Sequence, residues 1–119
     1  MLSKQKGHYL GSEINEIWWK RYTKDRLFAR GVGEYWYDDS AFYFRRYLTK
    51  TPIVLNYADI IELKTGYWHA GKWGAGRPIL KIIWQHKGIR LSSGFLLTCH
   101  SEAYQRIRQQ FLAVNNRPR

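Results

Sequence analysis

Residues 79–114 read ILKIIWQHKGIRLSSGFLLTCHSEAYQRIRQQFLAV, and this stretch decides the fold class. Its first two thirds are short aliphatic and aromatic runs. The turn signal His86-Lys87-Gly88 separates two of these runs, and Gly94 is expected to break a third from the second. This part therefore predicts three consecutive strands, at 79–85, 89–92 and 95–98.

The last third of the same stretch has a helical period. Four apolar side chains recur three or four residues apart and would share one helix face: Tyr104, Ile107, Phe111 and Val114. Ser101 can cap the first turn, where the charge of Glu102 is favourable. We predict an amphipathic C-terminal helix over 101–114 that packs on the sheet.

Upstream of this stretch, a sequence pattern typical of β-strands begins at Leu27. Aromatic and β-branched runs alternate with turn residues, which predicts four more strands, at 27–37, 41–48, 53–56 and 60–65. Asp38-Asp39-Ser40 is typical of a tight turn, because Asp and Ser side chains bond the nearby backbone. The glycine-rich residues 66–78 are predicted to form a long loop. The fold class is therefore mainly β, with seven strands and a C-terminal helix.

Residues 1–26 are expected to form an N-terminal extension to a domain at 27–119. Its first eleven residues are expected to form a mobile lead-in. Ser12 can cap a helix, and four apolar residues then follow at helical spacing: Ile14, Ile17, Trp18 and Tyr22. We predict a short N-terminal helix from about Glu13 to Tyr22, followed by a basic segment.

The composition points to a polyanionic partner. The chain has 119 residues, enough for one core, with a formal net charge of +11 and 17% aromatic residues. Such a charge favours association with nucleic acid, anionic lipid or an acidic protein. The lone Cys99 can make no internal disulfide, and no apolar run of about 20 residues is present. We expect a cytoplasmic chain whose membrane contact, where it occurs, is peripheral at the inner surface.

Seven short strands followed by one amphipathic helix resemble the pleckstrin-homology superfold, including GRAM-like and bacterial PH-like domains. Three segments carry the resemblance: the hairpin at 30–46, the turn into a strand at 58–63, and the approach to the helix at 89–97. It implies two nearly orthogonal antiparallel sheets in a partly open barrel, with the helix plugging one end.

The chain also departs from that family. Phosphoinositide-binding members carry Lys and Arg around the loop of the first hairpin, where this chain has Asp38-Asp39-Ser40. Members often place a Trp in the closing helix, where this chain has Phe111. Many PH-like domains bind peptides or partner proteins instead, so the resemblance supports the fold better than a lipid ligand.

The sequence contains no motif whose residue spacing matches a known catalytic, metal-binding or cofactor-binding site. The four histidines lie far apart in the sequence: His8, His69, His86 and His100. Gly71-Lys72 is followed by Trp73, so a phosphate-binding loop does not match. The sequence gives no basis for assembling an acid, a base and a nucleophile into one catalytic site. We predict a chain that is not an enzyme, with no catalytic residue, metal or cofactor.

Clusters of basic and aromatic residues remain as candidate sites. The strongest is in the glycine-rich loop, with these predicted ligand-binding residues: Lys64, Trp68, Lys72, Trp73 and Arg77. Its glycines would let backbone approach an anion closely. The alternative is that Trp68 and Trp73 fold back to cover one end of the barrel.

Two further clusters lie outside that loop. The predicted N-terminal helix and its sequel supply candidate membrane or partner contacts: Trp18, Trp19, Lys20, Arg21, Lys24 and Arg26. The alternative is a helix docked on the barrel with a solvated basic edge. Arg45 and Arg46 are consecutive on a strand, so they face opposite ways.

These observations favour a non-enzymatic binding module that recognises an anionic membrane surface or an acidic protein segment. The alternative is a nucleic-acid-binding protein that uses the same basic and aromatic surface, although no known RNA- or DNA-binding motif is present. Aromatic strand edges also leave a homodimer open.

Overall fold

The computed structural model describes residues 4–24, 27 and 30–115. Within these ranges the chain forms one eight-stranded antiparallel sheet, a separate two-stranded hairpin, a 3₁₀ turn and one α-helix. The sheet strands are β1 (Gln5–Ile14), β2 (Ile17–Arg21), β3 (Gly31–Tyr37), β4 (Ala41–Arg46), β5 (Ile53–Asn56), β6 (Ile60–Gly66), β9 (Ile79–His86) and β10 (Ile89–Leu97). The remaining elements are the 3₁₀ turn η1 (Tyr57–Asp59), the hairpin strands β7 (Trp68–His69) and β8 (Lys72–Trp73), and the helix α1 (His100–Asn115).

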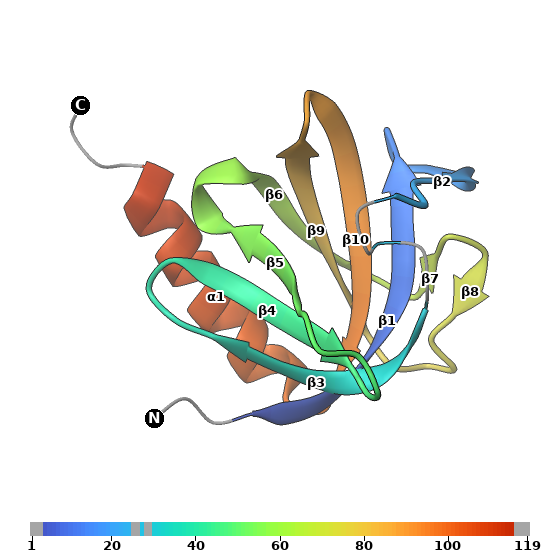
Figure 1. The fold of residues 1–119 in the computed structure, drawn as a ribbon, viewed down its shortest axis with the longest axis horizontal. Helices are drawn as coiled ribbons and strands as arrows, with labels where there is room; N and C mark the ends of the chain where they lie inside the picture. The colour runs from blue at the N-terminus through green and yellow to red at the C-terminus, as the bar shows by residue number, and fades with distance from the viewer. Residues whose placement is uncertain (1–3, 25–26, 28–29, 116–119) are drawn as a thin grey trace.

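The sheet has the order β5-β4-β3-β1-β10-β9-β6, and β2 pairs with the end of β1 outside this path. It curls into a half-barrel, and α1 packs against one side of it (Figure 1). β1 lies in the middle, where it pairs with β3 and with β10. Residues expected to belong to an extension therefore supply a central strand.

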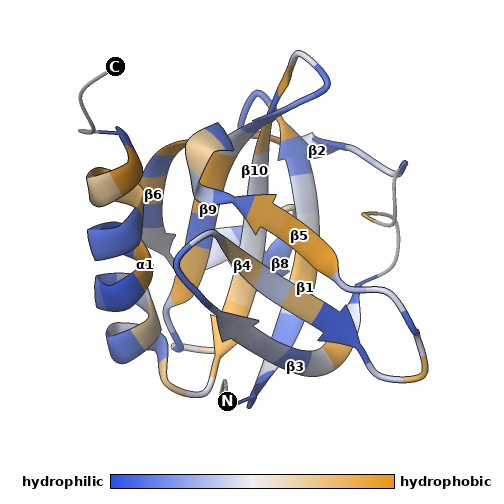
Figure 2. Ribbon diagram, turned by 60° about the vertical axis from the view of Figure 1, so that its left-hand side comes forward, coloured by the Kyte–Doolittle hydropathy of each residue, from blue (hydrophilic) through white to orange (hydrophobic). Residues whose placement is uncertain are grey.

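The hydrophobic core fills the concave side of the curl. Side chains of alternate residues point to this side, among them the fully buried Tyr9, Phe42 and Phe95. α1 closes the core with its apolar face, and its polar face is turned to solvent (Figure 2). The predicted helix stripe is confirmed, because all four of its members pack in or against this core: Tyr104, Ile107, Phe111 and Val114.

A directed chain of hydrogen bonds runs through the core. The Trp84 indole donates to Ser93 Oγ at 2.9 Å, Ser93 Oγ lies 2.6 Å from Ser12 Oγ, and Ser12 Oγ lies 2.7 Å from Tyr9 OH. Tyr9 OH donates to the Leu27 carbonyl at 3.0 Å. Burial raises the pKa of Tyr9 to about 12, so the hydroxyl keeps its proton. An indole only donates and a carbonyl only accepts, so every hydroxyl between them must donate in one direction.

The predicted N-terminal helix is wrong. Residues 13–21 form the end of β1, a tight turn and β2, and Tyr22 follows the strand. Asn15 and Glu16 both have positive φ, 53° and 59°, which is the two-residue turn that suits a β-hairpin. Asn tolerates this conformation well, and the β-branched and aromatic residues that follow it favour a strand. The apolar spacing was therefore a coincidence of two strands joined by a turn.

The structure also tests the expected turn at Asp38, the expected strand break at Gly94 and the expected loop at 66–78. The turn at Asp38 is confirmed, since Asp38 Oδ1 accepts from the backbone of Ser40 and Ala41 at 2.8 and 2.9 Å. Gly94 does not break a strand, because β10 runs unbroken past it. The loop at 66–78 contains the β7–β8 hairpin, so the strand count exceeds seven.

Two adjacent serines provide a matched test of the hydrogen-bond chain. Ser93→Ala should lower the free energy of unfolding by about 1–3 kcal/mol, because it leaves the Trp84 indole and Ser12 without their partner. Ser92→Ala should be neutral, because Ser92 Oγ is buried without a hydrogen-bond partner among the described residues. Urea denaturation of both variants measures the difference; equal losses would contradict the chain.

Candidate functional site

The β7–β8 hairpin lies over the convex face of the sheet, on the side away from the core. Ala70 and Gly71 make its two-residue turn with φ of 49° and 80°. Trp68 pairs across the hairpin with Trp73, and their rings stack with centroids 6.3 Å apart. The tip of this small hairpin is fixed to the sheet by His69 and Ala70.

His69 is the anchor of the hairpin tip. Its side chain is fully buried, and its ring rests on Gly94 of β10 so closely that a Cβ at Gly94 would lie 2.4 Å from His69 Cδ2. Nε2 lies 2.8 Å from the Gly11 carbonyl. A carbonyl can only accept, so Nε2 carries the proton. Gly94 is therefore required for the ring to reach the sheet.

Ala70 is held by both of its backbone groups. Its N–H donates to Glu13 Oε2 at 2.7 Å, and its carbonyl accepts from the Arg30 guanidinium at 2.6 Å. Glu13 is buried, so this bond offsets part of the cost of burying a carboxylate. The hairpin tip is thus locked by three hydrogen bonds to side chains or backbone of β1 and its neighbours.

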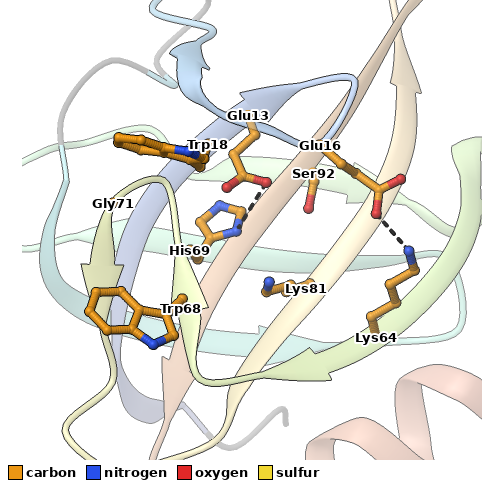
Figure 3. Close-up of a pocket in the computed structure, with 9 residues that line it drawn as sticks. All are labelled: Glu13, Glu16, Trp18, Lys64, Trp68, His69, Gly71, Lys81 and Ser92. Carbon is orange, nitrogen blue, oxygen red and sulfur yellow. Dashed lines mark hydrogen bonds and ion pairs between the residues drawn. The ribbon is translucent and has the colours of Figure 1, made fainter.

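A cavity of about 620 Å³ opens on one side of the hairpin (Figure 3). We call it the Glu13 cavity. It is lined by Glu13, Glu16, Trp18, Lys64, Trp68, His69, Gly71, Lys81 and Ser92. Figure 3 shows Trp18 and Trp68 at one side, Glu16 and Lys64 at the other, and the Glu13–His69 pair between them.

Two buried polar atoms in the Glu13 cavity lack hydrogen-bond partners among the described residues: His69 Nδ1 and Ser92 Oγ. Nδ1 lies 3.7 Å from Glu13 Oε1, which is too long for a hydrogen bond. Burial is the main cause that lowers the pKa of His69, and the charge of Glu13 opposes it. The ring is therefore held neutral, with Nδ1 as an open acceptor.

A second cavity, of about 410 Å³, lies on the other side of the hairpin. We call it the cationic cavity, because its lining has basic groups and no carboxylate: His8, Leu10, Arg30, Gly31, Lys72, Trp73, Gly74, Ala75, Arg77 and Leu96. Burial lowers the pKa of His8, and the charges of Lys72, Arg30 and Arg77 lower it further. The cavity is therefore a region of positive potential without a counter-ion from the described residues.

Four exposed tryptophans lie on the two hairpins: Trp18, Trp68 and Trp73 line a cavity, and Trp19 packs against Trp18. Trp18, Trp19, Trp68 and Trp73 are each between 60% and 65% exposed. Trp18 and Trp19 form an edge-to-face pair, and a Cβ at Gly71 would lie 3.6 Å from the Trp18 ring. The β1–β2 and β7–β8 hairpins thus present their indoles next to each other. Large exposed aromatic surface of this kind marks an interaction site.

The residues predicted for the glycine-rich loop are divided between the two cavities. Lys72, Trp73 and Arg77 line the cationic cavity. Lys64 and Trp68 line the Glu13 cavity, where Lys64 donates to Glu16 at 2.7 Å. The loop folds back over the sheet, but the alternative that Trp68 and Trp73 cover one end of the barrel is wrong. The loop folds back through His69 and leaves both of its tryptophans largely exposed.

The predicted N-terminal contacts lie on β2 and after it. Trp18, Trp19 and Lys20 are exposed, and Lys24 is exposed in the following segment. Arg21 turns inward, since a Cβ at Gly11 would lie 3.1 Å from its guanidinium. Arg26 lies outside the described residues. Arg45 pairs with Glu34 at 2.8 Å, and Arg46 crosses Gly31, so the two face opposite ways as expected.

Sequence reasoning missed Glu13, His69 and Ser92. Glu13 was assigned to a helix start, and His69 was one of four histidines without a near neighbour. A usable signal was Gly94 inside a strand-like run, because an interior glycine often marks a close approach of another group. Nothing local indicated that the approaching group would be His69.

Gly94→Ala should release the hairpin. The new Cβ would overlap the His69 ring, so we expect a loss of about 1–3 kcal/mol in stability and faster amide exchange at 69–71. Gly66→Ala is the control, because its Cβ would meet only the flexible end of Lys81 at 3.1 Å. A double-mutant cycle with His69→Ala should show coupling; additive effects would contradict the contact.

Removing a charge from the cationic cavity should raise the pKa of His8. Lys72→Ala deletes the largest of the charges that lower it, and inorganic phosphate bound there should act in the same direction. An NMR pH titration of the His8 ring measures both shifts. Lys50→Ala is the control, since Lys50 does not act on His8; identical titrations in all variants would argue against the cavity's potential.

The chain matches no protein-family model, no curated protein and no solved structure. Within residues 4–24, 27 and 30–115, no three or more His, Cys, Asp or Glu side chains are grouped to hold a metal ion. No helix in the same ranges has the length and apolar character needed to cross a bilayer. Its own geometry is therefore the basis for what the site can bind.

Proposed function

We propose that the chain is a non-enzymatic module of PH-like fold that attaches to an anionic membrane surface from the cytoplasmic side. The cationic cavity takes lipid headgroup phosphate or carboxylate, and the exposed tryptophans enter the interfacial layer. The observation that carries this proposal is a cavity lined by Lys72, Arg77, Arg30 and His8 without a carboxylate, next to exposed indoles.

The order of elements supports the fold part of the proposal. With β2 and the β7–β8 hairpin set aside, seven antiparallel strands form one continuous path and α1 follows them. The path is one curled sheet where two sheets were expected, and α1 closes its core as the C-terminal helix of a PH-like barrel would (Figure 1). In this path the Asp38 turn joins β3 and β4, which are the second and third strands, so it is not the loop that follows the first strand. The proposed anion site lies beside β7–β8.

The chemistry of the exposed residues favours a bilayer over a folded protein. Indole rings are enriched at the membrane–water interface, where one part of the ring is apolar and the N–H stays hydrated. Lys72 and Arg77 have no ion-pair partner within the described ranges, so both are available to anionic headgroups. Each such cation contributes about 1 kcal/mol near an anionic leaflet.

The Glu13 cavity supports binding rather than catalysis. Ser92 Oγ has no hydrogen-bond partner among the described residues, so His69 does not activate it. His69 Nε2 donates to the Gly11 carbonyl, and the open Nδ1 has no hydrogen-bonded hydroxyl or thiol among the described residues. A nucleophile with a hydrogen-bonded base is therefore not assembled here.

Vesicle sedimentation tests the proposal. We expect the chain to bind phosphatidylcholine vesicles containing phosphatidylserine more tightly than pure phosphatidylcholine, with a difference that shrinks as salt rises. Replacing both Lys72 and Arg77 by Ala should weaken anionic binding roughly thirtyfold, by the loss of about 2 kcal/mol. Arg106→Ala with Arg108→Ala, an exposed pair on α1, removes the same net charge and should cost much less.

The same variants separate the competing partners. Equal binding to neutral and anionic vesicles would remove the membrane proposal. Binding to an acidic peptide, or a steep salt-dependent affinity for DNA or RNA, without preference for anionic vesicles would assign the cationic cavity to that partner instead.

A further inference from the structure

The floor of the Glu13 cavity has polar atoms whose partners are missing from the described residues. His69 Nδ1 and Ser92 Oγ are both buried without a hydrogen bond. Leaving a buried polar group unpaired costs about 1–3 kcal/mol, and the unpaired atoms here share one cavity. Because both atoms face one cavity, a molecule bound there can supply the hydrogen bonds.

The geometry defines what that molecule must offer. His69 Nδ1 and Glu13 Oε1 are both acceptors, 3.7 Å apart, because Nε2 carries the ring proton. Glu13 Oε2 is already occupied by the Ala70 N–H, so only Oε1 is open. A ligand with two adjacent hydrogen donors, one for each acceptor, would satisfy the pair. Ser92 Oγ could then accept or donate to a third group.

The charges around the cavity favour a neutral ligand. An anion would meet the carboxylate of Glu13. A cation would meet Lys81, which has no ion pair within the described part of the chain. The neighbouring ion-pair group adds no net charge, because Lys64 and Arg90 together offset Glu16 and Glu62, at 2.7 Å for Lys64–Glu16, 3.8 Å for Lys64–Glu62 and 3.0 Å for Arg90–Glu16. One open carboxylate and one ammonium group thus line the cavity, and a neutral ligand that both donates and accepts hydrogen bonds suits the two together.

The walls suit a ring with an apolar face. Trp18 and Trp68 border the mouth of the cavity and leave much of their indole surface open (Figure 3). The face of an indole carries partial negative charge, which attracts the weakly positive C–H hydrogens of a packed ring. A volume of about 620 Å³ is typical of a site for a small molecule.

We propose that the Glu13 cavity binds a neutral saccharide ring. Adjacent hydroxyls donate to Glu13 and His69, a further hydroxyl pairs with Ser92 or Lys81, and the C–H face of the ring packs on Trp18 or Trp68. This site goes beyond the proposed membrane attachment. It lies on the other side of the β7–β8 hairpin from the cationic cavity and uses different side chains.

NMR titration of the full chain tests this proposal. The probes are glucose, galactose, mannose and N-acetylglucosamine, with uridine and adenosine for comparison. We expect at least one sugar to shift the indole N–H signals of Trp18 and Trp68 saturably, while that of the buried Trp84 stays in place. Glu13→Gln should weaken binding about tenfold, because a hydrogen bond to a charged group is lost.

Two further variants distinguish a loss of sugar binding from a loosened hairpin and from an effect of the cationic cavity. Ser92→Ala removes one polar contact without disturbing a hydrogen bond, so it tests the cavity even where Glu13→Gln loosens the hairpin tip. The Lys72→Ala, Arg77→Ala pair should leave sugar binding unchanged, which separates this site from the cationic cavity. The proposal is overturned by no saturable shift with any of the four sugars, by binding of nucleosides alone, or by unaltered affinity in both Glu13→Gln and Ser92→Ala.

Discussion

The site depends on one irregularity in the backbone, the bulge at Leu10 and Gly11 of β1. The pairing with β10 shifts there, so Tyr9 opposes Phe95 and Gly11 opposes Gly94. In a regular strand, residues three apart face opposite sides, yet Tyr9 and Ser12 both point into the core and hydrogen-bond each other. The extra residue makes this possible, and the same step sends Glu13 to the convex face. Gly11 has a φ of 106°, a conformation that a side chain would strain.

The bulge also explains how the hairpin is held. It turns the Gly11 carbonyl toward His69, and Gly94 opposite it leaves room for the ring. A histidine is suited to this position because its flat ring fits on bare backbone while one nitrogen donates. The result is a hairpin as short as β7–β8 with a fixed place on the sheet, although a two-stranded ribbon of this size would not be stable alone.

The sequence predicted the parts of the fold that local patterns determine. The α1 stripe, the Asp38 turn and β5 follow from periodicity and turn chemistry at neighbouring residues. β1 escaped prediction, because Gly7, His8 and Gly11 have poor strand propensity and become a strand by pairing on both sides. The candidate site was not predicted for a related reason. Glu13, His69 and Ser92 lie on three separate elements, and only the folded sheet with its hairpin brings them together.

The latched hairpin separates two chemically different cavities. Trp68 contributes to the Glu13 cavity and its cross-strand partner Trp73 to the cationic cavity, so one stacked pair supplies a wall to each. Arg30 reinforces this link, since it holds the Ala70 carbonyl and lines the cationic cavity at the same time. The hairpin that His69 fixes to the sheet therefore stands between a cavity that contains the buried Glu13 carboxylate and a cavity that basic groups line without a carboxylate.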